Sequence, residues 1–199
     1  MLIVETKITQ WMKTQAFNAQ QRRLIVGSLL GDAHVVKTTQ GYAYRANHGK
    51  AQREYIHWKY QYLKPFIRTE PKLSQEYCWH FRTVTHPEMS GFRSRWYEGN
   101  RKKLCIEDVE KHLDAFALAV WIMDDGAKDK NQLRLNSQCF NESENQKLQR
   151  FLQAKLKIKS TLNRDKKWFR IRIAGESMPK LVRMVRPHVI SSMLYKLPL

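Results

Sequence analysis

Apolar residues recur along this chain at two spacings, which divide it into helices and strands. In the first half, apolar residues three or four positions apart predict helices at 20–32, 50–66 and 86–100. Runs of β-branched and aromatic residues predict a hairpin at 33–48, around a Thr-Gln-Gly turn, and strand structure at 71–84. Pro65 and Gly99 are expected to end the second and third helices.

The second half repeats this order. The pattern predicts helices at 114–126, 141–156 and 177–189, a strand at 131–140, and a hairpin at 160–175. Asn163, Arg164 and Asp165 are expected near the turn of that hairpin, and Asn141 or Ser143 is expected to cap the helix at 141–156. Each half therefore reads αββαββα, which predicts an α+β fold made of two pseudo-symmetric subdomains.

The charge balance indicates the class of molecule that the protein binds. The chain carries 36 Lys and Arg against 18 Asp and Glu, a net charge of +18. Residues 1–99 hold 15 basic against 7 acidic side chains and residues 100–199 hold 21 against 11, so the excess is not confined to a tail. A folded protein this basic usually binds a polyanion, most often nucleic acid. The alternative is a solvated basic surface, as on ribosome-associated or membrane-surface proteins.

Composition excludes several other classes. No run of about 18 apolar residues is present, so we expect no membrane span. The segment MLIVETKITQWMK has no long apolar stretch and does not resemble a secretion signal. Three cysteines without CxxC spacing argue against a disulfide scaffold and a zinc knuckle. We therefore expect an intracellular protein, in the cytoplasm, the nucleoid or an organelle.

Two of the predicted helices end on carboxylates, in LIVGSLLGD and LAVWIMDDG. Asp32 ends the first, and Asp124 and Asp125 end the second. A helix C-terminus carries partial negative charge, so a carboxylate there is unfavourable unless a cation offsets it. Mg²⁺ binds one or two carboxylates together with water and phosphate oxygens. The alternative is a turn entry, because Asp-Gly is a common helix ending.

Small residues suggest that these two helices meet. Gly27 and Gly31 are four positions apart on the first helix, and Ala117 and Ala119 lie on the second. Small residues at helical spacing allow two backbones to approach closely. If the helices pack in parallel, Asp32 and Asp125 become neighbours.

The two stretches resemble the two copies of the LAGLIDADG motif. IVGSLLGDA occupies 25–33 and LAVWIMDDG occupies 118–126, the second being the closer match. The penultimate Asp of the pattern falls on Asp32 and Asp125, and its final Gly falls on Ala33 and Gly126. The sequence departs from the pattern mostly at positions that serve helix packing: Ala33, Leu30, Met123 and Val120. The resemblance covers nearly the whole chain, including SMLYKLP near its end.

Two motifs in one short chain imply a single-chain, intron-encoded homing endonuclease, with a first repeat at 14–105 and a second at 106–199 in one compact monomer. The resemblance implies that the motif helices form the interface between repeats and that antiparallel strands form a saddle that reads double-stranded DNA. It also implies a divalent metal, Mg²⁺, held at Asp32, Ala33, Asp125 and Gly126, and hydrolysis of one phosphodiester on each strand. Asp124 lies about 100° round the helix from Asp125 and is a weaker ligand candidate.

The predicted strands suit a role in reading DNA. Arg can contact guanine, and Asn or Gln can contact adenine, through two hydrogen bonds. The candidate readers are Arg45, Asn47, Arg82, Thr83, Arg134, Asn136, Arg170 and Arg172. About half or more of such contacts go to phosphate and sugar, so some of these side chains are expected to position the DNA without reading it.

The resemblance also implies secondary catalytic residues. It places a polar residue after the first hairpin of each repeat, at His48 and Gln138, where a side chain can orient the attacking water. It places a basic residue late in each repeat. Lys103 lies 71 residues after Asp32 and Lys196 lies 71 after Asp125, an equal offset that favours Lys103 over Lys102. Such a lysine can stabilise developing charge or simply bind a phosphate.

Three other functions compete with DNA cleavage. An RNA-binding intron maturase is the first, with intron RNA as its partner, and it can retain both aspartates. A transcription regulator on the same fold is the second, but regulators of this kind typically lose the acidic residues. A generic ribosome-associated protein is the third, and it leaves the paired aspartate-terminated helices unexplained.

Overall fold

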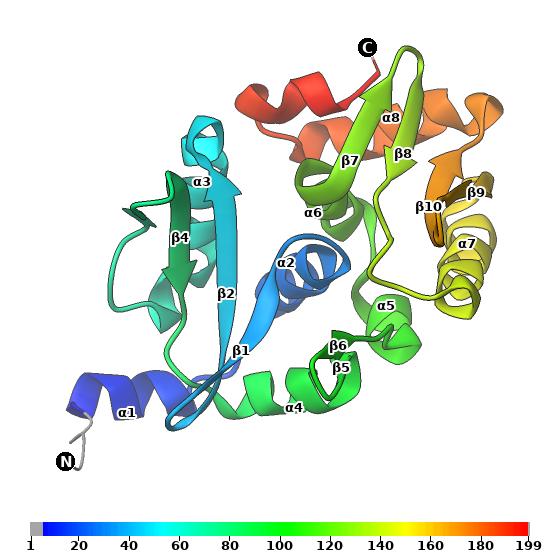
Figure 1. Cartoon of the computed structure of the whole chain (residues 1–199). Helices are drawn as coiled ribbons and strands as arrows, with labels where there is room; N and C mark the ends of the chain where they lie inside the picture. The colour runs from blue at the N-terminus through cyan, green and yellow to red at the C-terminus, as the bar shows by residue number, and fades with distance from the viewer. Residues whose placement is uncertain (1–5, 199) are drawn as a thin grey trace. The chain divides into compact units, whose positions relative to one another are not determined.

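Two four-stranded antiparallel sheets with the same plan organise the structure, a computed structural model that describes residues 6–198 (Figure 1). The strand order is β1-β2-β4-β3 in the first sheet and β7-β8-β10-β9 in the second. In each sheet the second strand along the chain pairs with the fourth strand, β2 with β4 and β8 with β10, so the two sheets share one topology. The predicted α+β class with a repeated plan is confirmed.

Two compact units contain these sheets. The first holds the described residues up to Arg22 together with Ala33–Ser94, and the second holds Arg23–Asp32 together with the chain from Arg95 onward. The division falls about ten residues earlier than the repeat boundary predicted at 105, and the end of the first motif helix belongs with the second unit. The repeat boundary itself stays a prediction.

The first unit carries its sheet on helix α3. Its elements, some of them shared with the second unit, are α1 (Lys7–Thr14), α2 (Ala19–Leu30), β1 (His34–Thr38), β2 (Gly41–Gly49), α3 (Arg53–Leu63), β3 (Lys72–Leu73), β4 (Cys78–Arg82) and α4 (Pro87–Trp96), with 3₁₀ turns at Lys50–Gln52 and Lys64–Phe66. The Phe81 ring of β4 packs near the rings of Tyr44 on β2 and Tyr60 on α3. Because side chains alternate along a strand, this leaves the opposite face of the sheet open.

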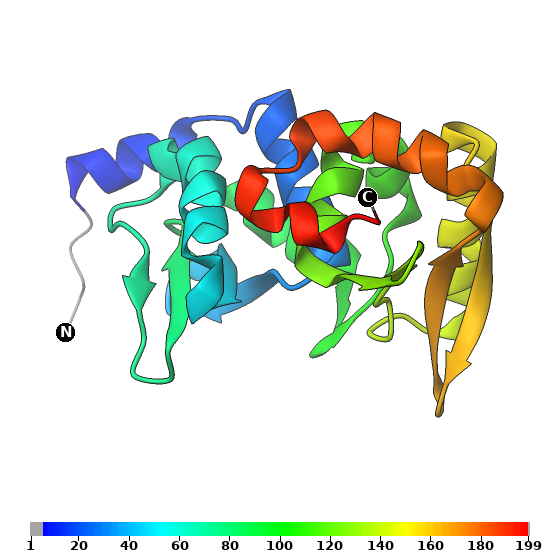
Figure 2. The same cartoon turned by 90° about the horizontal axis from the view of Figure 1, so that it is seen from above.

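The second unit carries its sheet on α7, with α6 and α8 packed together. Its elements are β5 (Tyr97–Glu98), β6 (Arg101–Lys102), α5 (Ile106–His112), α6 (Ala115–Asp125), β7 (Gly126–Asp129), β8 (Gln132–Leu135), α7 (Glu142–Leu156), β9 (Ser160–Asp165), β10 (Trp168–Ile173) and α8 (Met178–Val185), with 3₁₀ turns at Gly175–Ser177, Arg186–His188 and Ser191–Lys196. Figure 2 shows the β9–β10 hairpin extending away from α8.

Local chemistry explains the boundaries of the longest helix. The Asn141 side chain accepts from the Glu144 N–H, and the Glu144 carboxylate accepts from the Asn141 N–H, which forms a capping box. Of the two predicted caps, Asn141 is therefore the one used. At its other end the helix stops at Lys157, which adopts a left-handed conformation with φ 56°.

Asn163, Arg164 and Asp165, expected near the hairpin turn, lie at the end of β9 directly before it; the turn falls at Lys166 and Lys167, where Lys166 takes the positive φ that the turn requires. Two local predictions need correction. β7 follows α6 directly, although its short sequence GAKD showed no strand pattern. The helix expected to run to Gly99 stops at Trp96, and a short β5–β6 hairpin follows it. Among the described residues, no helix is long and apolar enough to cross a membrane.

Candidate active site and nucleic-acid interface

The end of α2 packs against α6 at two glycines, within the second unit. A Cβ on Gly27 would overlap the Ala117 carbonyl oxygen and lie 3.0 Å from the Val120 Cβ. A Cβ on Gly31 would lie 2.5 Å from the Asp124 Cβ. Because the contact moves toward the C-terminus of both helices together, the helices run parallel. The glycines permit the close approach that the sequence predicted.

This packing brings carboxylates together at the two helix ends. Asp125 is the last residue of α6 and is half-buried, whereas Asp32 follows α2 by two residues and is exposed. Burial first, and then the neighbouring Asp32 and Asp124 carboxylates, raise the pKa of Asp125 to about 7, while Lys102 and Lys196 act to lower it. The structure therefore places Asp32 and Asp125 close enough for their charges to interact.

A lysine caps each of these helix ends. Lys102 Nζ donates to the Gly31 carbonyl oxygen at 2.8 Å, and Lys196 Nζ donates to the carbonyl oxygens of Asp124 at 3.2 Å and Gly126 at 2.9 Å. Ammonium groups are favourable where the helix dipole is negative. Burial lowers the pKa of Lys102, and the nearby aspartates oppose that shift.

Lys102 was missed because the offset argument selected its neighbour. In the short β6 strand the side chains alternate, so Lys102 points inward and is buried while Lys103, just beyond the strand, is half-buried. Lys102 lies 71 residues after the Gly31 carbonyl that it binds, and Lys196 lies 72 residues after the Asp124 carbonyl that it binds. The two lysines that act alike are therefore not equally spaced from the motifs, and equal spacing does not identify the equivalent lysine. No pattern in the sequence marked the two-residue strand that orients Lys102. A catalytic role for Lys103 stays a prediction.

The donor set at the helix ends fits a hard divalent cation. A cation placed between the Asp32 and Asp125 carboxylates would relieve the repulsion that helps to raise the pKa of Asp125. No group of three or more His, Cys, Asp or Glu side chains within residues 6–198 is arranged as a complete metal site. Water and phosphate oxygens would therefore supply the remaining ligands, as Mg²⁺ commonly requires. Of the other two residues predicted at the metal site, Gly126 has a carbonyl oxygen that already accepts from Lys196, and Ala33 is buried in the first unit. Metal binding at Gly126 and Ala33 stays a prediction.

Gly126 does not serve as a left-handed helix cap, which was the alternative explanation of the Asp-Gly ending. Its φ is −69°, a value open to any residue. A Cβ there would overlap the Ile122 carbonyl oxygen, so the position requires glycine for close approach. The carboxylates of α6 are thus not explained by turn chemistry.

The predicted readers of the second unit share the open face of its sheet. Arg134 on β8 pairs directly with Arg172 on β10, and Arg170 lies two residues along β10 on the same face. Asn136 continues β8, where its N–H donates to the Asp125 carbonyl oxygen at 3.0 Å. This contact ties the end of β8 to the end of α6, and so ties the basic face to the carboxylates.

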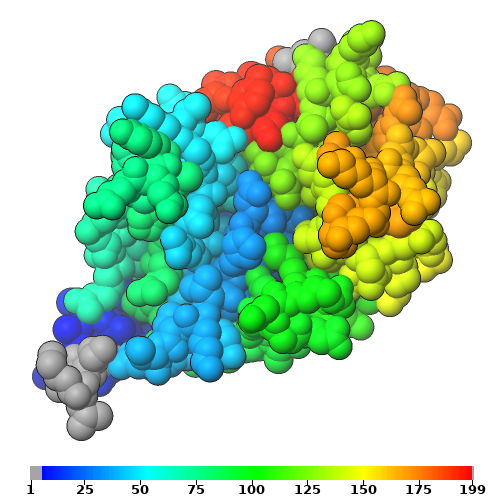
Figure 3. Space-filling model, viewed as in Figure 1, coloured from blue at the N-terminus to red at the C-terminus, as the bar shows by residue number. Residues whose placement is uncertain are grey.

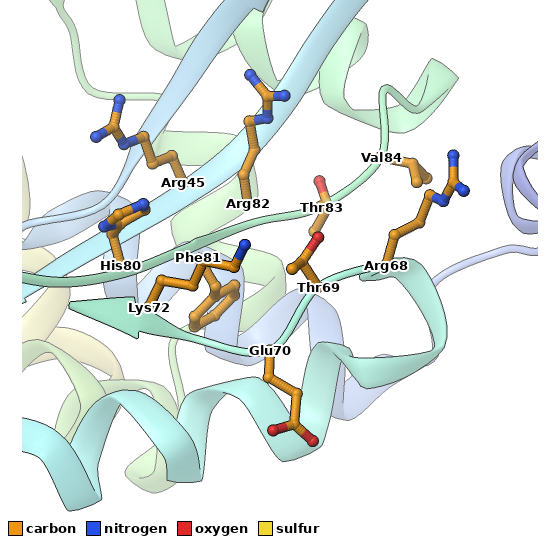
Figure 4. Close-up of a pocket in the computed structure, with 10 residues that line it drawn as sticks. All are labelled: Arg45, Arg68, Thr69, Glu70, Lys72, His80, Phe81, Arg82, Thr83 and Val84. Carbon is orange, nitrogen blue, oxygen red and sulfur yellow. The ribbon is translucent and has the colours of Figure 1, made fainter. Parts of the chain in front are cut away.

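The first unit has a similar open face. Arg45 on β2 stands directly opposite Arg82 on β4, and both are exposed. Like charges in such a pair repel each other, so a bound anion is the natural counterpart. Around Arg82 lies a hollow of about 530 Å³ whose rim includes Arg68 and Lys72 (Figure 4). Asn47 accepts from Arg45 Nε at 3.0 Å.

Two predicted site residues of this unit are buried. Thr83 is buried, and its hydroxyl accepts from the Tyr44 N–H at 3.1 Å, while the residue also lines the hollow around Arg82 (Figure 4). His48 is also buried, with its ring 4.8 Å from that of Tyr55 on α3. Strand alternation puts His48 on the opposite face from Asn47, its neighbour, and the sequence argument took no account of this. In the second unit, half-buried Gln138 donates to Asp165 at 3.4 Å.

Comparisons with known proteins agree with this geometry. A family model for the LAGLIDADG DNA endonuclease family matches residues 22–181. Cytochrome b mRNA maturase bI2 of Saccharomyces cerevisiae is 33% identical over 87% of the chain, and the match spans only 46% of that maturase. DNA endonuclease I-ChuI of Chlamydomonas applanata is 29% identical over 89% of the chain and 94% of I-ChuI.

Solved structures show the same fold. The homing endonuclease I-WcaI, bound to its DNA recognition sequence, has a TM-score of 0.86 at 20% identity, covering 98% of the chain and 94% of I-WcaI. I-DmoI in complex with DNA and Mn has a TM-score of 0.54 at 13% identity, covering 84% of the chain and 96% of I-DmoI. Together with the family match over most of its length, these likenesses lead to one conclusion: the chain belongs to the LAGLIDADG DNA endonuclease family.

Proposed function

We propose that this protein is a homing endonuclease that cuts both strands of DNA at one long, asymmetric site in the presence of Mg²⁺. The observation that carries the proposal is the pair of carboxylates, Asp32 and Asp125, brought together by two glycine-packed parallel helices. The basic open faces of the two sheets support DNA as the substrate, and so do relatives that are named as DNA endonucleases. Since its target is genomic DNA, we place the protein inside the cell, in an organelle or in the cytoplasm.

Each residue near the carboxylates has a distinct part. Asp32 and Asp125 would hold Mg²⁺, which when bound supplies an activated water and charge stabilisation for phosphodiester hydrolysis. Lys102 and Lys196 hold the carbonyl ends of the two helices and so fix the carboxylates in place. Their positive charge also favours the approach of a phosphate. Gln138 is a candidate for orienting water, while buried His48 is left out of the proposal.

The test begins with a selection of cleaved sites from a randomised duplex library in Mg²⁺. Plasmid carrying the selected site is then cut with wild-type protein, Asp32→Asn, Asp125→Asn and, as a matched loss of charge on an exposed part of α5, Glu110→Gln. The two aspartate variants should bind the site as wild type does and lose cleavage by orders of magnitude. Wild-type protein that selects no site, or aspartate variants that cut normally, would overturn the proposal.

Lysine variants separate catalysis from phosphate binding. Lys102→Met and Lys196→Met should lower cleavage far more than DNA affinity, because both act at the helix ends. Lys103→Met should lower affinity and cleavage together if Lys103 only binds a phosphate. If Lys103→Met alone abolishes cleavage, the role of the basic residue belongs to Lys103, as the offset in the sequence predicted.

A second candidate is an intron maturase, because relatives named as cytochrome b mRNA maturases are 33% and 31% identical to this chain. Those proteins have additional length, so their activity does not carry over directly. A splicing assay with the intron that flanks the reading frame tests it. Splicing that survives Asp32→Asn while cleavage is lost would establish two activities, and no stimulation of splicing would leave the endonuclease alone.

A further inference from the structure

Two aspartates stand on the open face of the second sheet, where the DNA is proposed to bind. Asp129 ends β7 opposite Gln132, and Asp165 ends β9 opposite Trp168, the first residue of β10. Figure 3 shows the β9–β10 hairpin at the molecular surface. A carboxylate on such a face repels phosphate and lowers DNA affinity. Their presence in a chain of net charge +18 therefore needs an explanation other than affinity.

Each aspartate holds one of the arginines that are candidates for reading bases. Asp129 Oδ2 lies 3.2 Å from Arg134 Nη2, and Asp165 Oδ2 lies 2.5 Å from Arg170 Nη2. The four side chains are between 30% and 50% exposed, and ion pairs that solvent reaches this well add little to stability. Stability is therefore not a sufficient reason for the two pairs.

The geometry leaves the arginines able to do more. A guanidinium has five N–H donors, and each ion pair engages the Nη2 group. The Nε atoms of Arg134 and Arg170 are buried and have no hydrogen-bond partner in the part of the chain that the structure describes, so an outside acceptor does not reach them. Each arginine is thus oriented by its aspartate, while the Nη1 donors, which neither ion pair engages, remain for an additional acceptor.

In the first unit an arginine is held in a similar way, by the uncharged amide oxygen of an asparagine. Arg45 Nε donates to the Asn47 Oδ1 at 3.0 Å, two residues further along β2 on the same face. Three arginines on open sheet faces are therefore held by a neighbouring oxygen. A long side chain fixed in this way loses less freedom when it forms two hydrogen bonds to a base.

We propose, on the basis of the function proposed above, that Asp129 and Asp165 are specificity-determining positioning residues. They hold Arg134 and Arg170 toward the major groove, where a guanidinium binds the O6 and N7 atoms of guanine. They also oppose the alternative in which the same arginines bind a phosphate, since a phosphate would meet the carboxylate as well. Specificity is a difference between affinities, and here it is gained at a cost in total affinity.

This leads to a pair of opposite expectations. When Asp165 becomes Asn, the guanine preference at the base pair that Arg170 contacts should fall on the order of tenfold. Affinity for DNA of random sequence should rise, because one negative charge leaves the binding face. Asp129→Asn should do the same at a different base pair, the one contacted by Arg134, and it leaves the contact between Gln138 and Asp165 intact.

The experiment measures base preference at every position of the selected site by binding competition in Ca²⁺, for wild type and both variants. Arg170→Ala and Arg134→Ala identify the two base pairs. Glu176→Gln is the matched control, since Glu176 pairs with Lys159 outside the sheet face. Melting temperatures measured alongside report any loss of folding.

The outcomes separate this inference from the proposed function. Preference lost only at the position that the matching arginine variant identifies, with random-sequence affinity raised, supports the inference. A preference profile equal to that of wild type, or affinity that falls for all sequences alike, overturns it and leaves the endonuclease standing. A wild-type protein without any base preference overturns both.

Discussion

Replacing Gly27 by Ala tests the packing that brings the two carboxylates together. The added methyl would enter the Ala117 carbonyl group, which is main chain and cannot rotate away, and it would also touch the Val120 Cβ at 3.0 Å. The helices must therefore move apart or bend. We expect overpacking to cost about 3 kcal/mol and the better helix propensity of Ala to return about 1 kcal/mol, for a net loss near 2 kcal/mol.

For a chain of this length, such a loss lowers the melting temperature by about 4–8 °C. Thermal unfolding followed by circular dichroism measures it. Gly175→Ala is the matched control, because a Cβ there has no atom within 4 Å, and its effect should stay within about 0.5 kcal/mol. Cleavage by Gly27→Ala should fall more than DNA affinity, since parting α2 from α6 shifts Asp32 relative to Asp125. A variant that melts at or above the wild-type temperature would refute the close-packing argument.

Three further predictions concern charge and assembly. In EDTA, the Asp125 carboxyl should contribute a loss of stability as the pH rises from about 4 to 7, because its folded-state pKa is raised to about 7. Over that range Asp125→Asn should therefore fare better than wild type by on the order of 1 kcal/mol when melting curves are compared. Binding isotherms at several salt concentrations should give a log–log slope of about −0.9 per phosphate contacted, and a slope near zero would exclude a basic interface. Since both motifs lie in one chain, light scattering should show a monomer both free and bound to one duplex; an obligate dimer would contradict this.

The helices and most strands could be predicted because their patterns are local. The spacing of Gly27 and Gly31 also predicted a contact, since small residues four apart have few other uses on an apolar helix. The aspartate pair followed from that contact. What the sequence could not supply was orientation. His48 and Asn47 are adjacent and equally polar, and only the pairing of β2 with α3 decides which of them is buried.

The orientation of the lysines could not be predicted for a similar reason. Lys102 and Lys103 differ in sequence position by one, and the choice between them depends on a two-residue strand that no pattern marked. The partners of the arginines were hidden as well, because Asn163, Arg164 and Asp165 were expected only near the turn of the last hairpin, with no register between its strands. Once the turn lies at Lys166 and Lys167, Asp165 becomes a strand residue across from the start of β10.

The lysines also change how the carboxylates at the helix ends are understood. On the sequence alone, a metal was the cation expected to offset aspartates placed at negative helix ends. In the structure, Lys102 and Lys196 already donate to the carbonyl groups there, so part of the unfavourable charge is offset before any metal binds. These hydrogen bonds from the lysines go to main-chain oxygens. If the lysines were only structural caps, carbonyl binding alone would suffice and an uncharged donor could replace them. Lys196→Gln should then retain cleavage as well as stability, whereas a role in attracting phosphate requires that cleavage fall while the melting temperature stays near that of wild type.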